Sequence, residues 1–185
     1  MTIHEHGFWE DTNLDNHIFD ESLCKSIIKF LKEHNIESII DIGCGHGEYT
    51  KNINYTNILC VGYDGNPNTN ELTNGLCYVK DFSIPQTFSV LFDYALCLEV
   101  AEHIPKNYED TFIQNLINCN CKGIILSWAI TGQGGHGHVN ERDNDYVIDL
   151  IQSYGYTYNK IESDKLRGEA TLFWFKNTLL IFQKN

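Results

Sequence analysis

The sequence predicts an α/β fold: one domain with a mostly parallel seven-stranded sheet, a terminal antiparallel strand pair and helices on both faces. Short apolar runs alternate with helical stretches along most of the chain, which is typical of parallel strands buried on both faces. After Gly155 the pattern changes, and two apolar runs follow with only a short segment between them. The 185 residues suffice for one well-buried core and are few for two.

Local signals place the individual elements. Asp20 is a helix-capping residue type, and apolar residues recur at helical spacing from Leu23 to Leu31, so a helix is expected there. The expected strands lie at residues 39–42, 58–63, 77–80, 91–98, 123–129, 156–161 and 178–182. Further helices are expected over 46–53 and 108–118, and a short helical or irregular segment over 166–175.

A glycine-rich turn follows the first strand. Asp41 ends the apolar run, and Gly43, Gly45 and Gly47 stand at alternate positions after it. Glycine lets the backbone turn tightly and approach a ligand, toward which the amides of the next helix point. The lysine and hydroxyl of a phosphate-binding P-loop are missing, and the spacing is shorter than the dinucleotide fingerprint. Such a turn by itself is typical of several nucleotide-binding folds.

An acidic residue also follows each of the next two strands. Asp64 closes the 58–63 run about twenty residues after the glycines, as in dinucleotide-type folds, and Asp81-Phe82 follows 77–80. Each acid alone is equally typical of a helix cap or a turn. Three acids in order, each at a strand end, favour a cofactor-binding edge.

With these acids, the turn resembles motif I of the S-adenosylmethionine (SAM) dependent methyltransferases of the Rossmann-like class. The resemblance covers residues 20–185 and implies a Rossmann-like domain, with Asp64 holding the ribose hydroxyls of SAM and Asp81 near its adenine. The residues expected to bind SAM are Asp41, Gly43, Gly45, Asp64, Asp81, Phe82 and Glu99.

A second group of polar residues follows the fourth strand. Glu99, Glu102 and His103 have the spacing E-x-x-E-H, and a glycine-rich loop after the fifth strand adds His136 and His138. Parallel strands end at one edge of the sheet, so both segments are expected to meet there. Two carboxylates with one or two imidazoles suit a divalent cation such as Mg²⁺, Mn²⁺ or Zn²⁺.

This spacing resembles the metal site of the small-RNA 3′-end 2′-O-methyltransferases and of the ubiquinone-pathway O-methyltransferases. The resemblance implies that Glu99, Glu102, His103 and His138 bind Mg²⁺ or Mn²⁺, with His136 as the alternative fourth ligand. In a metal-free alternative, His103 or His138 acts as a general base that a glutamate orients. The expected catalytic residues are His103, His138 and Glu102. The same spacing also occurs in metal-free relatives, in which the histidine only packs beneath the next helix.

The acceptor is predicted from a broader similarity. Residues 65–69, 133–142 and 174–178 resemble a small methyltransferase group of bacteria, algae and large DNA viruses, some of which methylate sugar hydroxyls on glycans. The asparagine- and isoleucine-rich composition indicates an AT-rich genome, as in a large virus or a low-GC microbe. Residues of types that commonly stack on sugars or hydrogen-bond to them lie in expected loops, and those expected to contact the acceptor are Trp9, His136, Asn140 and Arg142.

The net charge of the chain bears on the class of acceptor. A net charge of −12 argues against a nucleic-acid partner, which needs a basic surface. A sugar O-methyltransferase is therefore the first interpretation. The alternatives are an RNA ribose 2′-O-methyltransferase, a phenol or quinol O-methyltransferase acting on small molecules, and a non-catalytic SAM-binding protein.

Composition also bears on the cellular setting. No apolar run is long enough to span a membrane, and the acidic, histidine-rich N-terminus is unlike a signal peptide. Seven cysteines without a C-x-x-C pair are typical of a reducing compartment. The expected location is the cytoplasm, or the host cytoplasm if the protein is viral. Residues 1–19 fall outside the core pattern and are expected to form a segment that folds over the active site; the oligomeric state stays open.

Overall fold

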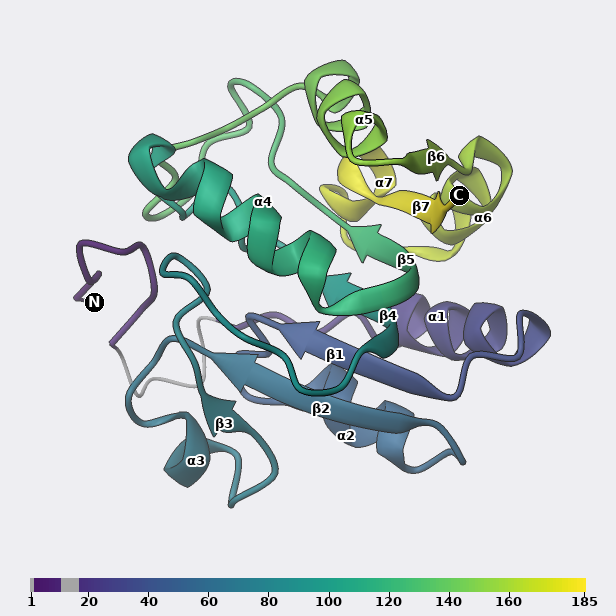
Figure 1. Ribbon diagram of the computed structural model, residues 1–185, viewed down its shortest axis with the longest axis horizontal. Coiled ribbons are helices and arrows are strands. Elements are labelled where there is room, and N and C mark those ends of the chain that lie inside the picture. The colour runs from purple at the N-terminus through teal and green to yellow at the C-terminus, as the bar shows by residue number, and fades with distance from the viewer. Residues whose placement is uncertain (1, 11–16) are drawn as a thin grey trace.

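The computed structural model describes residues 2–10 and 17–185 and contains a seven-stranded sheet with the order β3-β2-β1-β4-β5-β7-β6 (Figure 1). The strands are β1 (Ser38–Ile42), β2 (Leu59–Asp64), β3 (Tyr78–Val79), β4 (Phe92–Cys97), β5 (Asn120–Leu126), β6 (Tyr156–Tyr158) and β7 (Leu180–Lys184). All neighbouring pairs are parallel except those made by β7, which runs antiparallel to β5 and β6. The predicted fold class, including the antiparallel pair, is confirmed.

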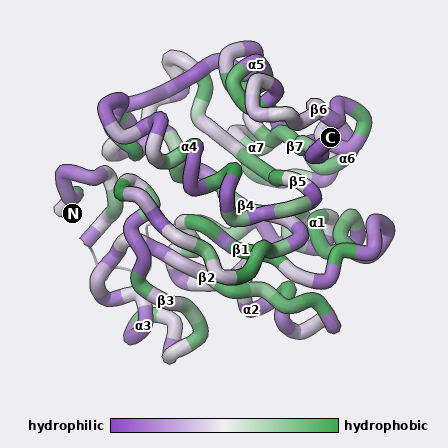
Figure 2. Tube along the Cα trace, in the orientation of Figure 1, coloured by the Kyte–Doolittle hydropathy of each residue, from purple (hydrophilic) through white to green (hydrophobic). Residues whose placement is uncertain are grey.

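Helices cover both faces of the sheet. They are α1 (Glu21–Glu33), α2 (Glu48–Asn54), α3 (Thr69–Leu72), the 3₁₀ turn η2 (Lys106–Tyr108), α4 (Glu109–Asn118), α5 (Asn144–Ser153), α6 (Lys160–Glu169) and α7 (Phe175–Thr178). Figure 1 shows α4 in front of the strands and α1 and α2 behind them. Side chains alternate between the faces along β1: Ile40 and Ile42 pack in the cluster of α4 and α5, and Ile39 packs in the cluster of α1 and α6. Figure 2 shows the hydrophobic colour in these central strands.

Element boundaries differ from the sequence prediction at the C-terminal end. The strand expected at 156–161 stops at Tyr158, because the side chain of Asn159 accepts a hydrogen bond from the amide of Glu162 (3.1 Å) and caps α6. The segment expected at 166–175 is therefore the end of α6 and a loop. β5 begins at Asn120, three residues earlier than predicted, and ends at Leu126. No described helix has the length and apolar character needed to cross a membrane.

Strand register aligns the loops that matter for function. Ile42 of β1 pairs with Tyr63 of β2 and with Cys97 of β4, and Cys97 pairs with Leu126 of β5. The loops after these four strands therefore leave the sheet at one level. The N-terminal segment lies beyond the arrowheads of β1 and β2 (Figure 1). This edge is where open α/β sheets bind ligands.

Candidate functional site

A cavity of about 530 Å³ lies at this edge of the sheet. Its walls come from the loops after β1, β2, β3, β4 and β5, from the N-terminal segment on one side and from residues 173–175 on another. The predicted residues that line it are Trp9, Asp41, Gly43, Gly45, Asp64, Asp81, Phe82, Glu99, Glu102, His103, His136 and His138. Residues from seven separate parts of the sequence thus meet in one space, whose size suits a cofactor.

The glycine turn after β1 has the shape that the sequence predicts. Gly43 and Gly45 have φ angles of +73° and +53°, which side chains disfavour. A Cβ on Gly43 would lie 2.2 Å from Cγ2 of Val100, so a larger residue does not fit. The carboxylate of Asp64 accepts hydrogen bonds from the amides of Gly45 and Asn66, each at 2.9 Å. Each carboxylate oxygen can accept another hydrogen bond, so Asp64 keeps capacity for a ribose hydroxyl.

Asp41 lies beneath this turn and is 3 % exposed. Burial raises the pKa of its carboxyl to about 7, although the hydroxyl of Thr50 donates a hydrogen bond to Oδ2 at 2.7 Å. A carboxylate with one partner in so buried a place is costly without a compensating positive charge. The sulfonium and ammonium groups of SAM carry such charge, so Asp41 fits this cofactor.

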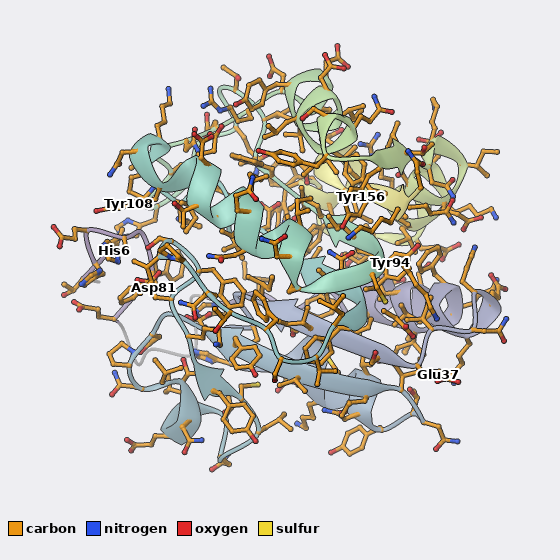
Figure 3. The ribbon with its side chains drawn as sticks, viewed as in Figure 1. His6, Glu37, Asp81, Tyr94, Tyr108 and Tyr156 are labelled. Atoms are coloured by element: carbon orange, nitrogen blue, oxygen red, sulfur yellow. The ribbon has the colours of Figure 1, made fainter. Side chains whose placement is uncertain are left out.

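Asp81 is held by the N-terminal segment. Its Oδ2 lies 2.5 Å from Nδ1 of His6, and its Oδ1 accepts hydrogen bonds from the amide and the hydroxyl of Ser83. Burial raises the pKa of Asp81, but the hydrogen bonds from Ser83 and His6 outweigh it and leave that pKa below its usual value. His6 also packs edge-on against Tyr108, and Figure 3 shows these side chains together at the edge of the molecule. The sequence did not indicate that His6 would reach Asp81.

Glu102, His103 and His138 form a compact cluster in the other half of the cavity. One potential ligand atom from each lies within 4.8 Å of the others. His136 is exposed and outside this cluster, so the geometry favours His138 of the two loop histidines. Glu99 is also outside it, although its carboxylate and that of Glu102 influence each other.

The carboxylate of Glu102 lacks a neutralising partner among the described residues. The side chain is fully buried, and within the part of the chain that the structure describes neither Oε1 nor Oε2 has a hydrogen-bond partner of good geometry. Burial raises the pKa of Glu102 well above its usual value, and the charge of Glu99 adds to the effect. Glu99 has a φ of +54°, a strained angle for a residue with a side chain. An unpartnered buried carboxylate beside two imidazoles is an arrangement that a divalent cation would satisfy, so these residues fit a metal.

Both imidazoles of the cluster are held by their Nδ1 atoms. Nδ1 of His103 lies 3.2 Å from the carbonyl oxygen of Gly137, and Nδ1 of His138 lies 3.0 Å from Oε1 of Glu141. Burial and, to a smaller extent, the neighbouring His138 lower the pKa of His103 to about 4. His103 is therefore neutral near pH 7, the form that a metal ligand or a general base requires.

Asn140 and Arg142 have a different position from the one expected. Neither lines the cavity. Both bind Oε2 of Glu109 at the start of α4, Asn140 through Nδ2 at 2.7 Å and Arg142 through NH2 at 2.8 Å. Asn140 is fully buried, and its carbonyl oxygen accepts a hydrogen bond from Nε1 of the buried Trp128. Through these hydrogen bonds, the C-terminal end of the 131–142 loop is held against the start of α4.

The N-terminal segment packs directly on the cluster. Ile3 and Trp9 form an antiparallel bridge around a turn, and a Cβ on Gly7 would lie 2.0 Å from the carbonyl oxygen of His103. The Trp9 ring contacts His103 and His136, with ring centroids 5.4 and 6.2 Å apart. The indole Nε1 of Trp9 is buried and has no hydrogen-bond partner among residues 2–10 and 17–185. Part of the expected N-terminal segment, residues 1 and 11–16, lies outside the described residues.

Asp20 has a second role that the sequence did not reveal. Its Oδ1 caps α1 through the amide of Leu23, as expected, at 3.0 Å. Its Oδ2 accepts hydrogen bonds from the amides of Thr171 and Leu172, at 2.7 and 2.8 Å. Asp20 thus ties residues 17–19 to residues 173–175, two walls of the cavity that are far apart in the sequence. Phe173 is 63 % exposed at this wall.

A family described as "Methyltransferase domain" matches residues 15–126. A comparison with curated proteins finds no match.

Several solved structures share the fold. A magnesium protoporphyrin IX methyltransferase from Synechocystis PCC 6803 with bound SAH has a TM-score of 0.68 and 16 % identity over 88 % of this chain and 82 % of that chain. The methyltransferase domain of a bacterial Hen1 has a TM-score of 0.64 and 17 % identity over 94 % and 100 %. An amino pentose methyltransferase from Micromonospora echinaspora with bound SAM has a TM-score of 0.67 and 11 % identity over 88 % and 90 %.

Proposed function

The chain belongs to the methyltransferase-domain family, and we propose that it is a SAM-dependent methyltransferase whose acceptor is a hydroxyl group of a sugar or glycan. We further propose that a divalent cation, Mg²⁺ or Mn²⁺, assists the transfer. The observation that carries the proposal is the fully buried carboxylate of Glu102, which has no hydrogen-bond partner of good geometry among the described residues and lies beside His103 and His138 in the same cavity as the glycine turn.

At the cofactor end of the cavity, the residues after β2 and β3 would bind two parts of SAM. Asp64 would bind the ribose hydroxyls, and Asp81 and Phe82 would contact the adenine. The turn of Gly43 and Gly45 allows close approach of the backbone. SAM supplies an electrophilic methyl group on a positively charged sulfur.

The acceptor end has to produce a nucleophile from an alcohol. A divalent cation would lower the pKa of a hydroxyl whose own pKa lies far above neutral. Glu102, His103 and His138 would hold it, with the Glu99 carboxylate adjoining. In the metal-free alternative, the neutral His103 accepts the hydroxyl proton, and its Nδ1 contact with the Gly137 carbonyl leaves Nε2 for that purpose.

Charge at the cavity favours a neutral acceptor over RNA. Among the described lining residues, Lys80 is the single lysine or arginine, and six side chains are carboxylates: Asp41, Glu48, Asp64, Asp81, Glu99 and Glu102. A phosphate backbone would find little compensating positive charge in this lining. The ring and the buried N–H of Trp9 suit a sugar, which stacks on aromatic rings and accepts hydrogen bonds. In this proposal residues 2–10 close the acceptor site.

A second candidate is methylation of an RNA ribose 2′-hydroxyl. The E-x-x-E-H spacing with His138 supports it, and one structural neighbour is a Hen1 domain. It requires a basic surface beside the cavity, which the lining residues do not supply.

The test is methyl transfer from labelled SAM to deoxysugar and aminosugar glycans, with Mg²⁺ or Mn²⁺ and again with excess chelator. Small RNAs and simple phenols or quinols are assayed in parallel. We expect transfer to a glycan that stops on chelation and returns when metal is restored. Transfer to a glycan that is unaffected by the chelator would support the sugar acceptor and would indicate that His103, without a metal, accepts the hydroxyl proton. Transfer to RNA or phenols alone, with SAM still bound, would overturn the sugar proposal.

A further inference from the structure

Glu141 lies at the centre of the glycine-rich loop that carries His138. Its Oε2 accepts a hydrogen bond from the amide of Gly132, and its Oε1 accepts one from the amide of Gly134, both at 2.7 Å. Oε1 also lies 3.0 Å from Nδ1 of His138. One side chain thus joins two turns of the loop and one imidazole of the cluster.

The three hydrogen-bond partners of Glu141 determine where the proton of the His138 ring lies. A backbone amide can only donate, so both oxygens of Glu141 act as acceptors. An ionised carboxylate has no proton to give, and the contact with His138 therefore requires the hydrogen to be on Nδ1. A neutral imidazole with its hydrogen on Nδ1 has a bare Nε2. This nitrogen is then the one able to bind a cation or accept a proton, and one nitrogen of His138 lies within 4.8 Å of ligand atoms of Glu102 and His103.

We propose that Glu141 is a positioning residue that fixes the tautomer of His138 and the course of the glycine-rich loop, so that Nε2 of His138 is presented to the acceptor site. In many metal sites a carboxylate binds the outer nitrogen of the ligating histidine and fixes the ring in the same way. The inference rests on the proposed function only in assigning His138 to the acceptor site.

Glutamine in place of Glu141 makes the inference testable, because its size is the same. One of its two polar atoms is an NH₂ group, which would face the amide donor of Gly132 or of Gly134. If the NH₂ group takes the position of Oε1, it also donates to Nδ1 of His138 and moves the ring proton to Nε2. A neutral side chain therefore cannot satisfy all three partners.

The experiment records the imidazole nitrogen and carbon-bound proton correlations of the ¹⁵N-labelled full chain by NMR, after treatment with chelator so that no metal sets the tautomer. The His138 signals are assigned from the spectrum of His138→Gln. The variants are Glu141→Gln, Glu141→Asp, which keeps the charge, and Glu169→Gln as a control in an exposed position of α6.

We expect the Nδ1–H form of His138 in the wild type and in Glu169→Gln. We expect a mixture of the two ring forms in Glu141→Gln, because one of its two amide orientations keeps an oxygen at Nδ1 and the other places the NH₂ group there. Glu141→Asp should retain more of the Nδ1–H form than Glu141→Gln. Transfer to the acceptor should fall roughly 10–100-fold in Glu141→Gln, with SAM affinity unchanged. A Glu141→Gln variant with both the tautomer and the transfer rate of the wild type, or a wild type with its proton on Nε2, would overturn the inference. A wild type that methylates no sugar would overturn the proposed function instead, and the tautomer result would stand.

Discussion

Two glycine-rich loops line the cavity, and they are held in different ways. The first, residues 43–47 after β1, is fixed by close packing: a Cβ on Gly43 would lie 2.2 Å from Val100, and one on Gly47 would lie 2.9 Å from Sγ of Cys77. In the second, residues 131–142 after β5, the packing varies: a Cβ on Gly135 would lie 2.2 Å from Nε2 of His138, and one on Gly137 would lie 2.6 Å from Cδ1 of Ile3. A Cβ on Gly132 or Gly134 would meet nothing within 4 Å.

Hydrogen bonds to two carboxylates hold the less tightly packed parts of the second loop. Glu141, within the loop, accepts hydrogen bonds from two of the loop amides. Glu109 of α4 accepts hydrogen bonds from Asn140 and Arg142 at the C-terminal end of the loop. Hydrogen bonds to carboxylates are strong and directional, but each depends on one side chain. Residues 43–47, the cofactor loop, are thus packed into the core. The conformation of residues 131–142, the acceptor loop, depends more on hydrogen bonds to a few acidic side chains. We therefore expect changes in one loop to leave the ligand of the other largely unaffected.

The largest expected effect follows from removing an acceptor-side histidine. His103→Ala should lower turnover by roughly 10³-fold, since metal or base assistance contributes several kcal/mol to the transition state. SAM affinity should stay within about twofold, because His103 contacts the N-terminal segment and the second loop. Steady-state turnover and SAM calorimetry check this. A fully active variant would remove His103 from the mechanism.

A matched pair of glycine substitutions compares the loops directly. Gly43→Ala combines a clash with Val100 and a positive φ angle, and should cost about 2–5 kcal/mol of unfolding free energy. Gly134→Ala has only the positive φ angle of +69° to overcome and should cost about 1–2 kcal/mol. Urea unfolding measures both. Equal decreases in unfolding free energy would show that packing constrains the two glycines to the same extent.

Asp41 should give the SAM-free protein a pH-dependent stability. Burial raises its pKa from 3.8 to about 7, so the folded state holds a proton that the unfolded state has lost. The stabilisation is present below pH 4 and disappears as the pH rises to about 7. Relative to the wild type, Asp41→Asn should therefore gain about 2–4 kcal/mol between pH 4 and pH 7. A difference between the two proteins that does not change with pH would contradict a protonated Asp41.

Asp64→Ala should affect the cofactor loop alone. It removes the proposed ribose contact and the acceptor for the amide of Gly45. Hydrogen bonds to a charged group contribute about 1.5–3 kcal/mol, so SAM should bind roughly 10–100-fold more weakly while the chain stays folded. Calorimetry and circular dichroism would show this. Unchanged SAM affinity would refute the role assigned to Asp64.

The two loops also differ in how far the sequence predicts them. The first follows from contiguous signals, an apolar strand, Asp41 and alternate glycines, and the structure has the turn as expected. In the second, the sequence identified the histidines but not their supports. Asn140 and Arg142 are residue types that suit a sugar, yet they bind Glu109, and that contact depends on where α4 lies. The contacts of His6 with Asp81 and of Asp20 with Thr171 likewise join residues 75 and 151 positions apart. Local patterns contain no signal for such pairs.

The most direct test of the acceptor-side assignment is a calorimetric titration of Mn²⁺ into the SAM-saturated wild type and into Glu102→Gln. The fully buried, unpartnered carboxylate of Glu102 predicts one Mn²⁺ site per wild-type chain. That site should be lost in the variant, with SAM affinity retained. A wild type that binds no Mn²⁺, or a variant that binds it equally well, would contradict the metal site at Glu102, His103 and His138.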